Sequence, residues 1–343
     1  MDSFDPLNIL VALQPGLGSP VEYEELIKER FPEEVRTGKI KIRLIQDGSA
    51  SSTPDEYLDT HIIGAGVVVE RVPEMKNLQW VMTFSAGIDH WEKWGKLPGH
   101  VALTNLPGGS GIPISEFVIG LMLNLAKKYN QLWDQQKERK FIRVRGEELY
   151  KKTVGIIGLG GIGRQIAKRA KAFDMKVIGT DINTADIPHV DEVYLSNESD
   201  QVIRQSDYLI LACPETEETR GMINERSLRL MKNTTYLINC ARGSLIIKED
   251  LIKALNEEWI AGAANDTHWI KKPLPSYLPA EDELWACKNI LITPHISSWS
   301  DQYAPRFGGV FVDNIERFLN KEPLLNVAPG FEGDPQWLKN VNA

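Results

Sequence analysis

The sequence has few cysteines, and their arrangement is not that of a metal site or a disulfide framework. Cys213, Cys240 and Cys287 are the only three in 343 residues. An odd number without the short spacings of zinc sites argues against both. We therefore expect no metal from them and a reducing compartment, which favours a cytoplasmic location.

Long apolar runs and an excess of basic residues are also missing. No apolar stretch is long enough to span a bilayer, and the segment from Met1 to Pro6 lacks the basic residues with which a signal peptide begins. The formal net charge of −8 disfavours nucleic acid and anionic membranes as partners. There are no internal repeats or low-complexity segments. The composition, 42% hydrophobic and 25% charged, is that of a globular protein, and the length predicts two domains.

One stretch, from Val154 to Asp181, has the features of a dinucleotide-binding unit. An apolar run suited to a buried strand leads into G-x-G-x-x-G, made by Gly158, Gly160 and Gly163. Apolar residues at helical spacing follow, and a second apolar run ends at Asp181. Strand, glycine turn, helix, strand and acid in this order are typical of a Rossmann unit. A glycine turn in an ordinary α/β sheet is the alternative.

Each glycine of the motif has its own physical role. Gly158 allows the tight turn, Gly160 lets the backbone approach a pyrophosphate because it lacks a Cβ, and Gly163 lets the helix pack closely on the strand. The N-terminus of the helix, at Gly161 and Ile162, offers unpaired N–H groups and the positive end of the helix dipole. We therefore expect the cofactor phosphates at these five residues.

The acid at the end of the second strand predicts which dinucleotide is bound. Asp181 lies 18 residues after Gly163, where a carboxylate can accept both ribose hydroxyls of NAD. A 2′-phosphate would be repelled by this carboxylate, so NAD is favoured over NADP. The sequence suggests no other cofactor site.

The rest of the chain alternates strand-like and helical segments, which predicts parallel α/β units. Before the glycine motif, strands are expected at residues 7–13, 40–45, 62–69, 78–84 and 101–105, with helices at 21–30 and 116–129. The charged stretch 131–149 is predicted to be a solvated helix. The apolar face of a C-terminal helix, from Val310 to Leu319, is expected to pack on the first domain. The predicted domains are therefore a discontinuous substrate domain, 1–107 with 298–343, and a nucleotide-binding domain, 108–297.

Three polar residues each follow a predicted strand in the second half of the chain: Arg242, Asp266 and His295. Ligands of doubly wound sheets bind outside the carboxyl ends of the strands. The donor fork of Arg242 can bind a carboxylate and an adjacent keto oxygen. His295 can give a proton to that oxygen in reduction or take it in oxidation, while a nicotinamide supplies the hydride. The plain alternatives are a surface ion pair for Arg242 and a satisfied loop histidine for His295.

Candidate substrate contacts are also found in the first part of the chain. Ser85, Ala86 and Gly87 form a small-residue turn after a predicted strand, and such a turn can point N–H groups at an anion. A plain strand-to-helix turn is the alternative. Arg71 follows the apolar run 67–69 and could also face a carboxylate. A solvated surface arginine is its alternative.

Together these motifs resemble the D-isomer-specific 2-hydroxyacid dehydrogenase family, and most closely its glyoxylate/hydroxypyruvate reductase-like branch. The resemblance covers nearly the whole chain, most clearly residues 60–330. The segments that carry it are G-L-G-G-I-G (158–163), A-R-G (241–243), P-L-P (273–275), T-P-H-I (293–296), S-A-G-I-D (85–89), E-T-R-G (218–221) and N-I-E-R-F (314–318).

The resemblance implies an NAD-binding domain and a flavodoxin-like substrate domain, both Rossmann-like, with an active-site cleft between them and a homodimer built around the nucleotide domain. It implies an NAD-dependent oxidoreductase that interconverts a 2-keto acid and a D-2-hydroxy acid. The N–H groups of Ala86 and Gly87 would bind the substrate carboxylate, Arg242 would be the second anchor, and His295 the acid/base. Further contacts on the cofactor side are expected from Cys213, Pro214, Thr219, Cys240 and Asp266.

One position departs from the family pattern. The family usually has D-V-F-x-x-E-P-L-P, whose glutamate hydrogen-bonds the catalytic histidine. Here T-H-W-I-K-K follows Asp266, one residue more than the family pattern has. Lys272 stands where the glutamate is expected, Lys271 matches if the count runs forward from Asp266, and neither alignment gives an acid. An ammonium near His295 would lower the pKa of the imidazole and leave it neutral near pH 7, a poorer proton donor. We therefore include Lys272 among the candidate catalytic residues.

Three explanations of this departure remain open. Another acid, Glu281, Asp282 or Glu283, takes the place of the glutamate. Alternatively, Lys272 binds an anionic group of a different substrate. In the third case the dehydrogenase chemistry is altered or lost, and the chain is an NAD-binding sensor or binding module.

Overall fold

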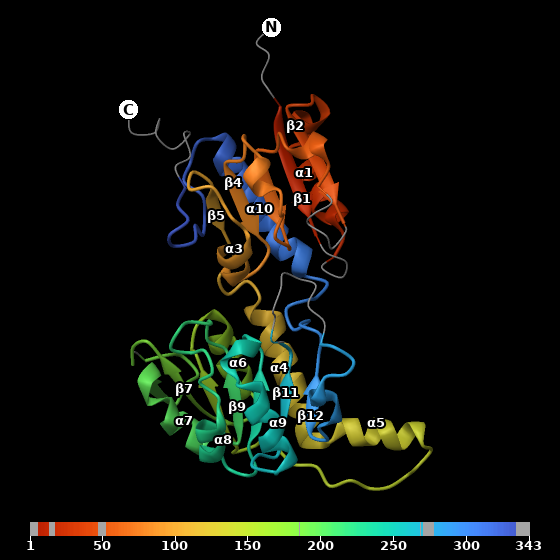
Figure 1. Cartoon of the computed structure of the whole chain (residues 1–343), viewed down its shortest axis with the longest axis vertical. Helices are drawn as coiled ribbons and strands as arrows, with labels where there is room; N and C mark the ends of the chain where they lie inside the picture. Colours follow the sequence, from red (N-terminus) through yellow and green to blue (C-terminus); the bar gives the residue numbers. More distant parts are fainter. Residues whose placement is uncertain are drawn as a thin grey trace. The chain divides into compact units, whose positions relative to one another are not determined.

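The computed structural model describes residues 6–13, 18–46, 53–184, 186–267, 269 and 278–333. The chain forms two compact units (Figure 1). Among the described residues, the first unit holds 6–110 and 299–333, and the second holds the remainder. Each unit is built on one β-sheet, of five and seven strands, and all strand pairs described run parallel. The predicted α/β class with two Rossmann-like sheets is confirmed.

The sheet of the first unit has the strand order β2-β1-β3-β4-β5. Its strands are β1 (Leu7–Ala12), β2 (Ile40–Ile45), β3 (Ile62–Ala65), β4 (Trp80–Thr83) and β5 (Ala102–Thr104). Its helices are α1 (Pro20–Arg30), α2 (Pro32–Arg36), α3 (Asp89–Trp94) and α10 (Tyr303–Leu319), with short 3₁₀ turns η2 (Asp55–Tyr57) and η3 (Val72–Glu74). The predicted strand 62–69 is therefore half as long as expected, because the chain turns away after Ala65.

Both faces of this sheet are buried, which explains the nearly continuous apolar run of β1. Ile9 and Val11 point to a core shared with α1 and α10, while Leu10 and Ala12 point to the opposite core. Alternate side chains of a strand face opposite ways, so a strand covered on both faces is apolar at nearly every position. Phe311 of α10 belongs to the first core, so this unit is completed by chain that follows the second unit.

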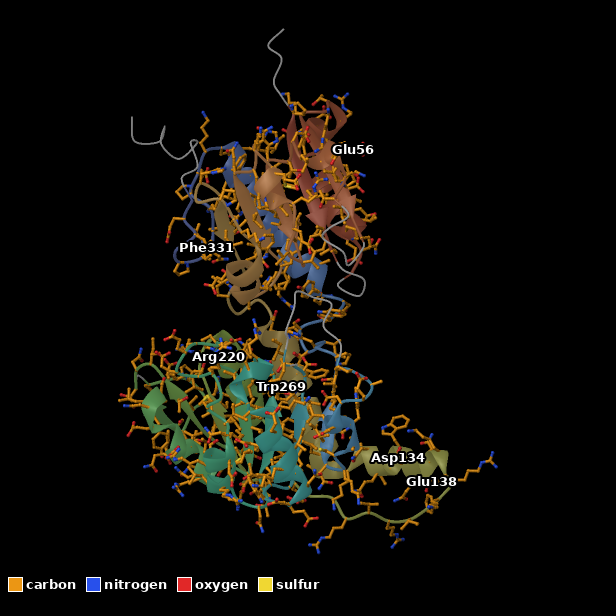
Figure 2. The ribbon with its side chains drawn as sticks, in the orientation of Figure 1. Glu56, Asp134, Glu138, Arg220, Trp269 and Phe331 are labelled. Atoms are coloured by element: carbon orange, nitrogen blue, oxygen red, sulfur yellow. The ribbon has the colours of Figure 1, made fainter. Side chains whose placement is uncertain are left out.

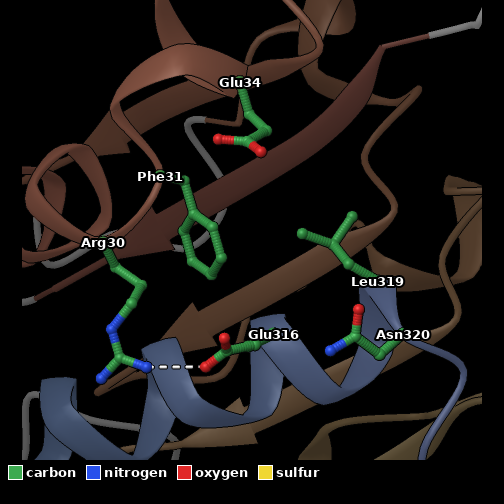
Figure 3. Close-up of a pocket in the computed structure, with 6 residues that line it drawn as sticks. All are labelled: Arg30, Phe31, Glu34, Glu316, Leu319 and Asn320. Carbon is green, nitrogen blue, oxygen red and sulfur yellow. Dashed lines mark hydrogen bonds and ion pairs between the residues drawn. The ribbon is translucent and has the colours of Figure 1, made fainter.

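A pocket of about 350 Å³ lies at the surface of this unit between α1 and α10 (Figure 3). The Arg30 guanidinium lines one side of it and pairs with Glu316 at 2.7 Å and with Asp313 at 3.0 Å. The pocket is lined by Arg30, Phe31, Glu34, Glu316, Leu319 and Asn320. None of the sequence-predicted site residues is among them, and the ion pairs serve to join the two helices.

The sheet of the second unit has the order β12-β11-β10-β9-β6-β7-β8. Its strands are β6 (Thr153–Ile157), β7 (Lys176–Asp181), β8 (Glu192–Leu195), β9 (Tyr208–Leu211), β10 (Tyr236–Asn239), β11 (Gly262–Asn265) and β12 (Ile290–Ile292). Within this sheet the chain first forms the interior strand β6, builds outward through β7 and β8, and then crosses to β9 on the other side of β6. The order therefore reverses beside β6, which is where doubly wound sheets bind their ligands.

Helices cover both faces of this second sheet. They are α4 (Gly111–Lys127), α5 (Tyr129–Lys137), α6 (Gly161–Lys171), α7 (Ser199–Gln205), α8 (Glu225–Leu230) and α9 (Lys248–Asn256), with 3₁₀ turns η4 (Ser196–Glu198), η5 (Gly243–Leu245) and η6 (Glu283–Ala286). One apolar core contains residues of α4 and α6, and a second contains residues of α7, α8 and α9. No helix in the described ranges meets the length and hydropathy that a membrane span requires.

Two helix predictions need correction. The helix predicted at 116–129 begins five residues earlier, at Gly111, because Pro113 is tolerated in a first turn, where N–H groups have no intrahelical acceptor. The helix predicted over 131–149 exists only as α5, which ends at Lys137. Lys128 and Arg139 have φ of 56° and 55°, and these left-handed residues break the helical path on both sides of α5.

Candidate cofactor and active site

The glycine turn lies between β6 and α6, and the structure shows why two of its glycines are needed. Gly158 has φ +99°, and a Cβ there would lie 2.8 Å from the backbone of Cys213. A Cβ on Gly163 would lie 2.0 Å from the carbonyl oxygen of Gly158. Around Gly160 the protein leaves open space. The turn is therefore tightly packed on one side, against the loop after β9, and open at Gly160.

The N-terminus of α6 has no acceptor of its own. Gly160 is the N-cap residue and provides no side-chain hydrogen bond. Among the described residues, the N–H groups of Gly161, Ile162 and Gly163 donate no recorded bond, and the first that does is that of Arg164, to Gly160 O at 3.0 Å. Free N–H groups at the positive end of a helix dipole form a site for a phosphate.

Asp181 ends β7 beside this turn. The N–H groups of Gly158 and Leu159 both donate to Thr180 O, at 3.2 and 3.0 Å, which ties the turn to the residue before Asp181. The half-buried Asp181 carboxylate accepts from the N–H of Ile182 at 2.7 Å. The acid predicted to bind a ribose is therefore fixed next to the proposed phosphate site.

The loop after β9 places Cys213 against the glycine turn and is braced by Thr219. The Thr219 hydroxyl donates to Pro214 O at 2.8 Å and accepts from the N–H of Thr216 at 2.7 Å. Burial raises the pKa of Cys213 to about 11 and that of Cys240, after β10, to about 12. Both thiols are therefore neutral at physiological pH, and that of Cys240 donates to Leu211 O at 3.2 Å.

Arg242 follows β10 and is held by Asn239. The fully buried Asn239 amide donates to Arg242 O at 2.8 Å, and its oxygen accepts from the N–H of Ala241 at 3.0 Å. The half-buried Arg242 side chain donates to Ala241 O at 2.8 Å. Sequence reasoning missed Asn239, although a polar residue at the end of a buried strand was a usable signal.

Asp266, after β11, holds the loop that carries His295. Its carboxylate is completely buried and accepts three hydrogen bonds: from the Thr293 hydroxyl at 2.6 Å and from the N–H groups of Ile296 and Ser297 at 3.0 and 2.9 Å. Between these anchors His295 has φ +57°, a left-handed conformation that a non-glycine residue adopts only when its surroundings impose it. Asp266 therefore fixes the backbone that presents His295.

The sheet brings Arg242, Asp266 and His295 to one edge. They follow β10, β11 and β12, which are neighbours in register, with Asn239 opposite Asn265 and Asn265 opposite Ile292. The glycine turn leaves the same carboxyl edge after β6. The structure therefore brings these three residues and the glycine turn to the same carboxyl edge of the sheet in the second unit, as the sequence motifs predicted.

In the first unit, the turn after β4 has its carbonyl groups tied back and its N–H groups open. The Ser85 hydroxyl donates to Gly87 O, and the Asn105 amide donates to Ala86 O, both at 2.6 Å. Within the described chain, no hydrogen bond is recorded for the N–H groups of Ala86 and Gly87. Such a turn can bind a carboxylate. Asn105 is a second bracing amide that sequence reasoning missed.

Arg71 is engaged by acids of its own surface. Its guanidinium pairs with Glu74 and with Asp55, each at 2.7 Å, and donates to Thr53 O at 2.8 Å. These partners favour the surface-arginine alternative over a substrate contact.

The departure at Lys272 lies outside the described residues, as do Lys271 and His268. Of the acids considered as substitutes, Asp282 forms an ion pair with Lys248 and caps η6 by accepting from the N–H of Leu284 at 3.1 Å. Glu281 and Glu283 are exposed. Within the described ranges no His, Cys, Asp and Glu side chains group into a metal site.

Known proteins resemble this chain in sequence. Residues 119–297 match the family model of the D-isomer specific 2-hydroxyacid dehydrogenase NAD binding domain. A glyoxylate reductase of Thermofilum pendens is 34% identical over 255 residues, covering 72% of this chain and 73% of that protein. A glyoxylate reductase of Thermococcus kodakarensis is 30% identical over 335 residues, covering 90% and 95%.

Solved structures agree with this likeness. A D-isomer specific 2-hydroxyacid dehydrogenase family protein from Aeromonas salmonicida superposes with a TM-score of 0.81 at 26% identity, covering 94% of this chain and 99% of that one. The sequence motifs, the doubly wound sheet and these matches agree over most of the chain. The chain belongs to the D-isomer specific 2-hydroxyacid dehydrogenase family, with an NAD(P)-binding domain of the kind found in its oxidoreductases.

Proposed function

We propose that this protein is an NAD-dependent oxidoreductase that interconverts a 2-keto acid and a D-2-hydroxy acid. The observation that carries the proposal is the buried Asp266 carboxylate, whose three hydrogen bonds fix the loop of His295 on the sheet edge that also bears Arg242 and the glycine turn. A buried carboxylate and a residue in a left-handed conformation each cost free energy. Such costs are typical of functional sites, and this supports a functional role for the loop.

In this proposal each residue has a separate role. Arg242 binds the substrate carboxylate and the adjacent keto oxygen through its donor fork, and the open N–H groups of Ala86 and Gly87 bind the carboxylate. His295 gives a proton to the keto oxygen in reduction and takes it back in oxidation. Gly160 and the N-terminus of α6 hold the pyrophosphate, and Asp181 holds the ribose. A bound nicotinamide supplies the hydride.

The experiment that tests the proposal is NADH oxidation by the purified chain with 2-keto acids of increasing side-chain size, from glyoxylate to phenylpyruvate. We expect turnover with at least one of them and binding of NADH in their absence. Binding of NADH without turnover of any 2-keto acid would contradict the dehydrogenase assignment and support the sensor or binding module. Failure to bind NADH would contradict both.

The residue that separates these two functions is Lys272, where the family usually has the glutamate partner of the histidine. If this lysine faces His295, the substitution Lys272→Glu should raise the pKa of the imidazole and extend ketoacid reduction to higher pH, by about one pH unit. The pH profiles of kcat/KM for the two proteins measure this shift. Lys288→Glu, at an exposed lysine of the same unit, is the control. Superimposable profiles would mean that Lys272 lies out of reach of the histidine.

Asp181 supports NAD as the cofactor, although one structural neighbour from Sinorhizobium meliloti, at 22% identity, is an NADPH-dependent glyoxylate/hydroxypyruvate reductase. Asp181→Ala should remove the repulsion of a 2′-phosphate and the bonds to the ribose hydroxyls. We expect kcat/KM to fall about tenfold with NADH and to rise about tenfold with NADPH. The control Asp186→Ala, at an exposed aspartate after β7, should leave kcat/KM unchanged with both NADH and NADPH. An unchanged NADH to NADPH ratio in Asp181→Ala would remove this residue from cofactor selection.

We also propose a homodimer, formed through the arm that comprises residues 127–152. α5 and the segment after it extend away from the sheet of their unit (Figure 1), and Figure 2 shows Asp134 and Glu138 on this extension. α5 buries none of its residues. The large apolar side chains that the arm leaves exposed are Tyr129, Leu132, Trp133, Phe141, Ile142 and Tyr150, and Phe141 is completely exposed. So many large apolar side chains exposed on one segment are typical of an interface.

The charge of the arm supports a second copy of the chain as the partner. Residues 127–152 contain nine basic and four acidic residues, a net +5, whereas the whole chain carries −8, so the remainder carries −13. A basic arm with aromatic residues is complementary to the acidic body of another copy. Sedimentation equilibrium should give twice the mass of the chain, and Trp133→Glu should weaken the dimer about a hundredfold. Trp285→Glu, at an exposed tryptophan outside the arm, should not. A monomeric wild type would contradict the proposal.

A further inference from the structure

We propose that Arg164 is a further cofactor-binding residue, whose guanidinium donates hydrogen bonds to the pyrophosphate of the dinucleotide. The inference rests on the proposed function, because it assigns to a side chain part of a contact that the motif assigns only to backbone N–H groups. Arg164 is the first residue after the glycine motif.

The side chain of Arg164 is folded back onto the glycine turn. Its Nε donates to the carbonyl oxygen of Leu159 at 2.8 Å, and Leu159 stands between the first two glycines of the motif. Side chains of a helix lean toward its N-terminus, and this bond fixes the guanidinium beside the first turn of α6. The arginine is therefore held where the free N–H groups of Gly161 and Ile162 are exposed.

The other faces of α6 are used for packing. Gly163, Ile166, Ala167 and Ala170 are buried against the sheet. A second face meets α4, where a Cβ on Gly111 would lie 3.0 Å from Gly161 O and 3.1 Å from Gln165 Cγ, and where Arg169 pairs with Glu116 at 3.0 Å.

At roughly 100° per residue, Arg164 and Lys168 occupy the remaining face of the helix. In the sheet, β9 and β10 lie on one side of β6, and β7 lies on the other. α4 contacts β10, whereas α6 contacts β7. The face of Arg164 is therefore the one on the side of β7, whose end bears Asp181. A dinucleotide with its pyrophosphate at the glycine turn and its ribose at Asp181 would lie along this face of α6.

The terminal nitrogens of Arg164 are free to bind it. The side chain is exposed, and in the part of the chain that the structure describes its only recorded bond is the one from Nε. The remaining donors form a planar fork that matches two phosphate oxygens. Because Nε is already bound to Leu159 O, little side-chain entropy remains to be lost on binding.

The test compares ligands with and without phosphate on the full-length protein. Isothermal titration should show that Arg164→Gln raises the Kd of NADH and of ADP-ribose about tenfold. The Kd of adenosine, measured by competition with NADH, should change by less than about twofold. Lys168→Gln, one turn later on the same exposed face, should alter none of these values. The wild-type Kd of ADP-ribose should also depend more steeply on salt than that of the Arg164→Gln variant.

An unchanged Kd of ADP-ribose in Arg164→Gln would overturn the inference. If the Kd of adenosine rose by the same factor, the inference would also be overturned, because the side chain would then act on the conformation of the glycine turn rather than on phosphate. If the substitution raised the Kd of NADPH tenfold but left that of NADH unchanged, Arg164 would bind a 2′-phosphate instead of the pyrophosphate. If the wild type bound neither NADH nor ADP-ribose, the proposed function would fail together with this inference, whereas binding by the wild type with no effect of the variant removes Arg164 alone.

Discussion

Replacing His295 with glutamine is expected to lower kcat for ketoacid reduction by about 10²- to 10⁴-fold, the range that a positioned general acid contributes. Glutamine can still donate a hydrogen bond to the keto oxygen, but it cannot transfer a proton. The Kd of NADH should remain within about twofold of the wild-type value, because the imidazole acts on the substrate. Single-turnover reduction under saturating NADH measures the chemical step directly.

The matched control is His189→Gln, at an exposed histidine of the same unit. It removes one imidazole without touching the loop after β12 and should keep full activity. If His295→Gln retained more than about a third of the wild-type kcat, the acid/base role would belong to another group. A loss of NADH binding in this variant would show that the substitution had disturbed the loop rather than the chemistry.

The position of His295 could be predicted from the sequence, but the means of holding it could not. A histidine directly after an apolar run identifies the carboxyl end of a strand, and the alternation of strands and helices predicts a parallel sheet whose carboxyl ends bind the ligand. The hydrogen bonds from Thr293, Ile296 and Ser297 to Asp266 join residues about thirty positions apart. No local pattern encodes such bonds, because they exist only once β11 and β12 are neighbours.

The bracing amides illustrate the same limit. Asn239 and Asn105 each hold a turn that carries candidate site residues, through bonds from side chain to backbone. In the sequence an asparagine at the end of a strand signals a position where an amide can brace the backbone, but it predicts no more than a turn there. Whether its amide supports a site depends on which carbonyl the fold places beside it.

The error over residues 131–149 has a local cause. This stretch is rich in charged residues with good helix propensity, and propensity alone favours a helix. In the structure the chain turns back after α5, and the N–H of Glu147 donates to Ala126 O at 2.7 Å. A Cβ on Gly146 would lie 2.9 Å from the same oxygen. The returning segment thus packs against the end of α4, and this tertiary contact replaces the helix.

The second large effect is expected at Gly163, where alanine should destabilise the nucleotide-binding unit. The added Cβ would lie 2.0 Å from Gly158 O and 3.2 Å from Ile156 Cγ2, so α6 must move away from β6. Overpacking of this kind costs about 1–3 kcal/mol or more. We expect a lower Tm and a weaker affinity for NADH, measured by thermal unfolding and by titration. Gly120→Ala, in α4 where the new Cβ meets nothing within 4 Å, is the helical control and should not lower Tm.

Gly160→Ala separates the two roles that glycine has in this motif. The residue has φ −71°, which alanine adopts without strain, and a Cβ there meets no protein atom within 4 Å. The free energy of unfolding should therefore stay the same. If the open space at Gly160 is where a pyrophosphate approaches the backbone, the methyl group should raise the Kd of NADH at least about tenfold. Unchanged affinity would mean that the cofactor does not approach this residue. A lower free energy of unfolding with an unchanged Kd of NADH would show that glycine is needed at this position for folding. The glycine motif would then be explained by packing alone.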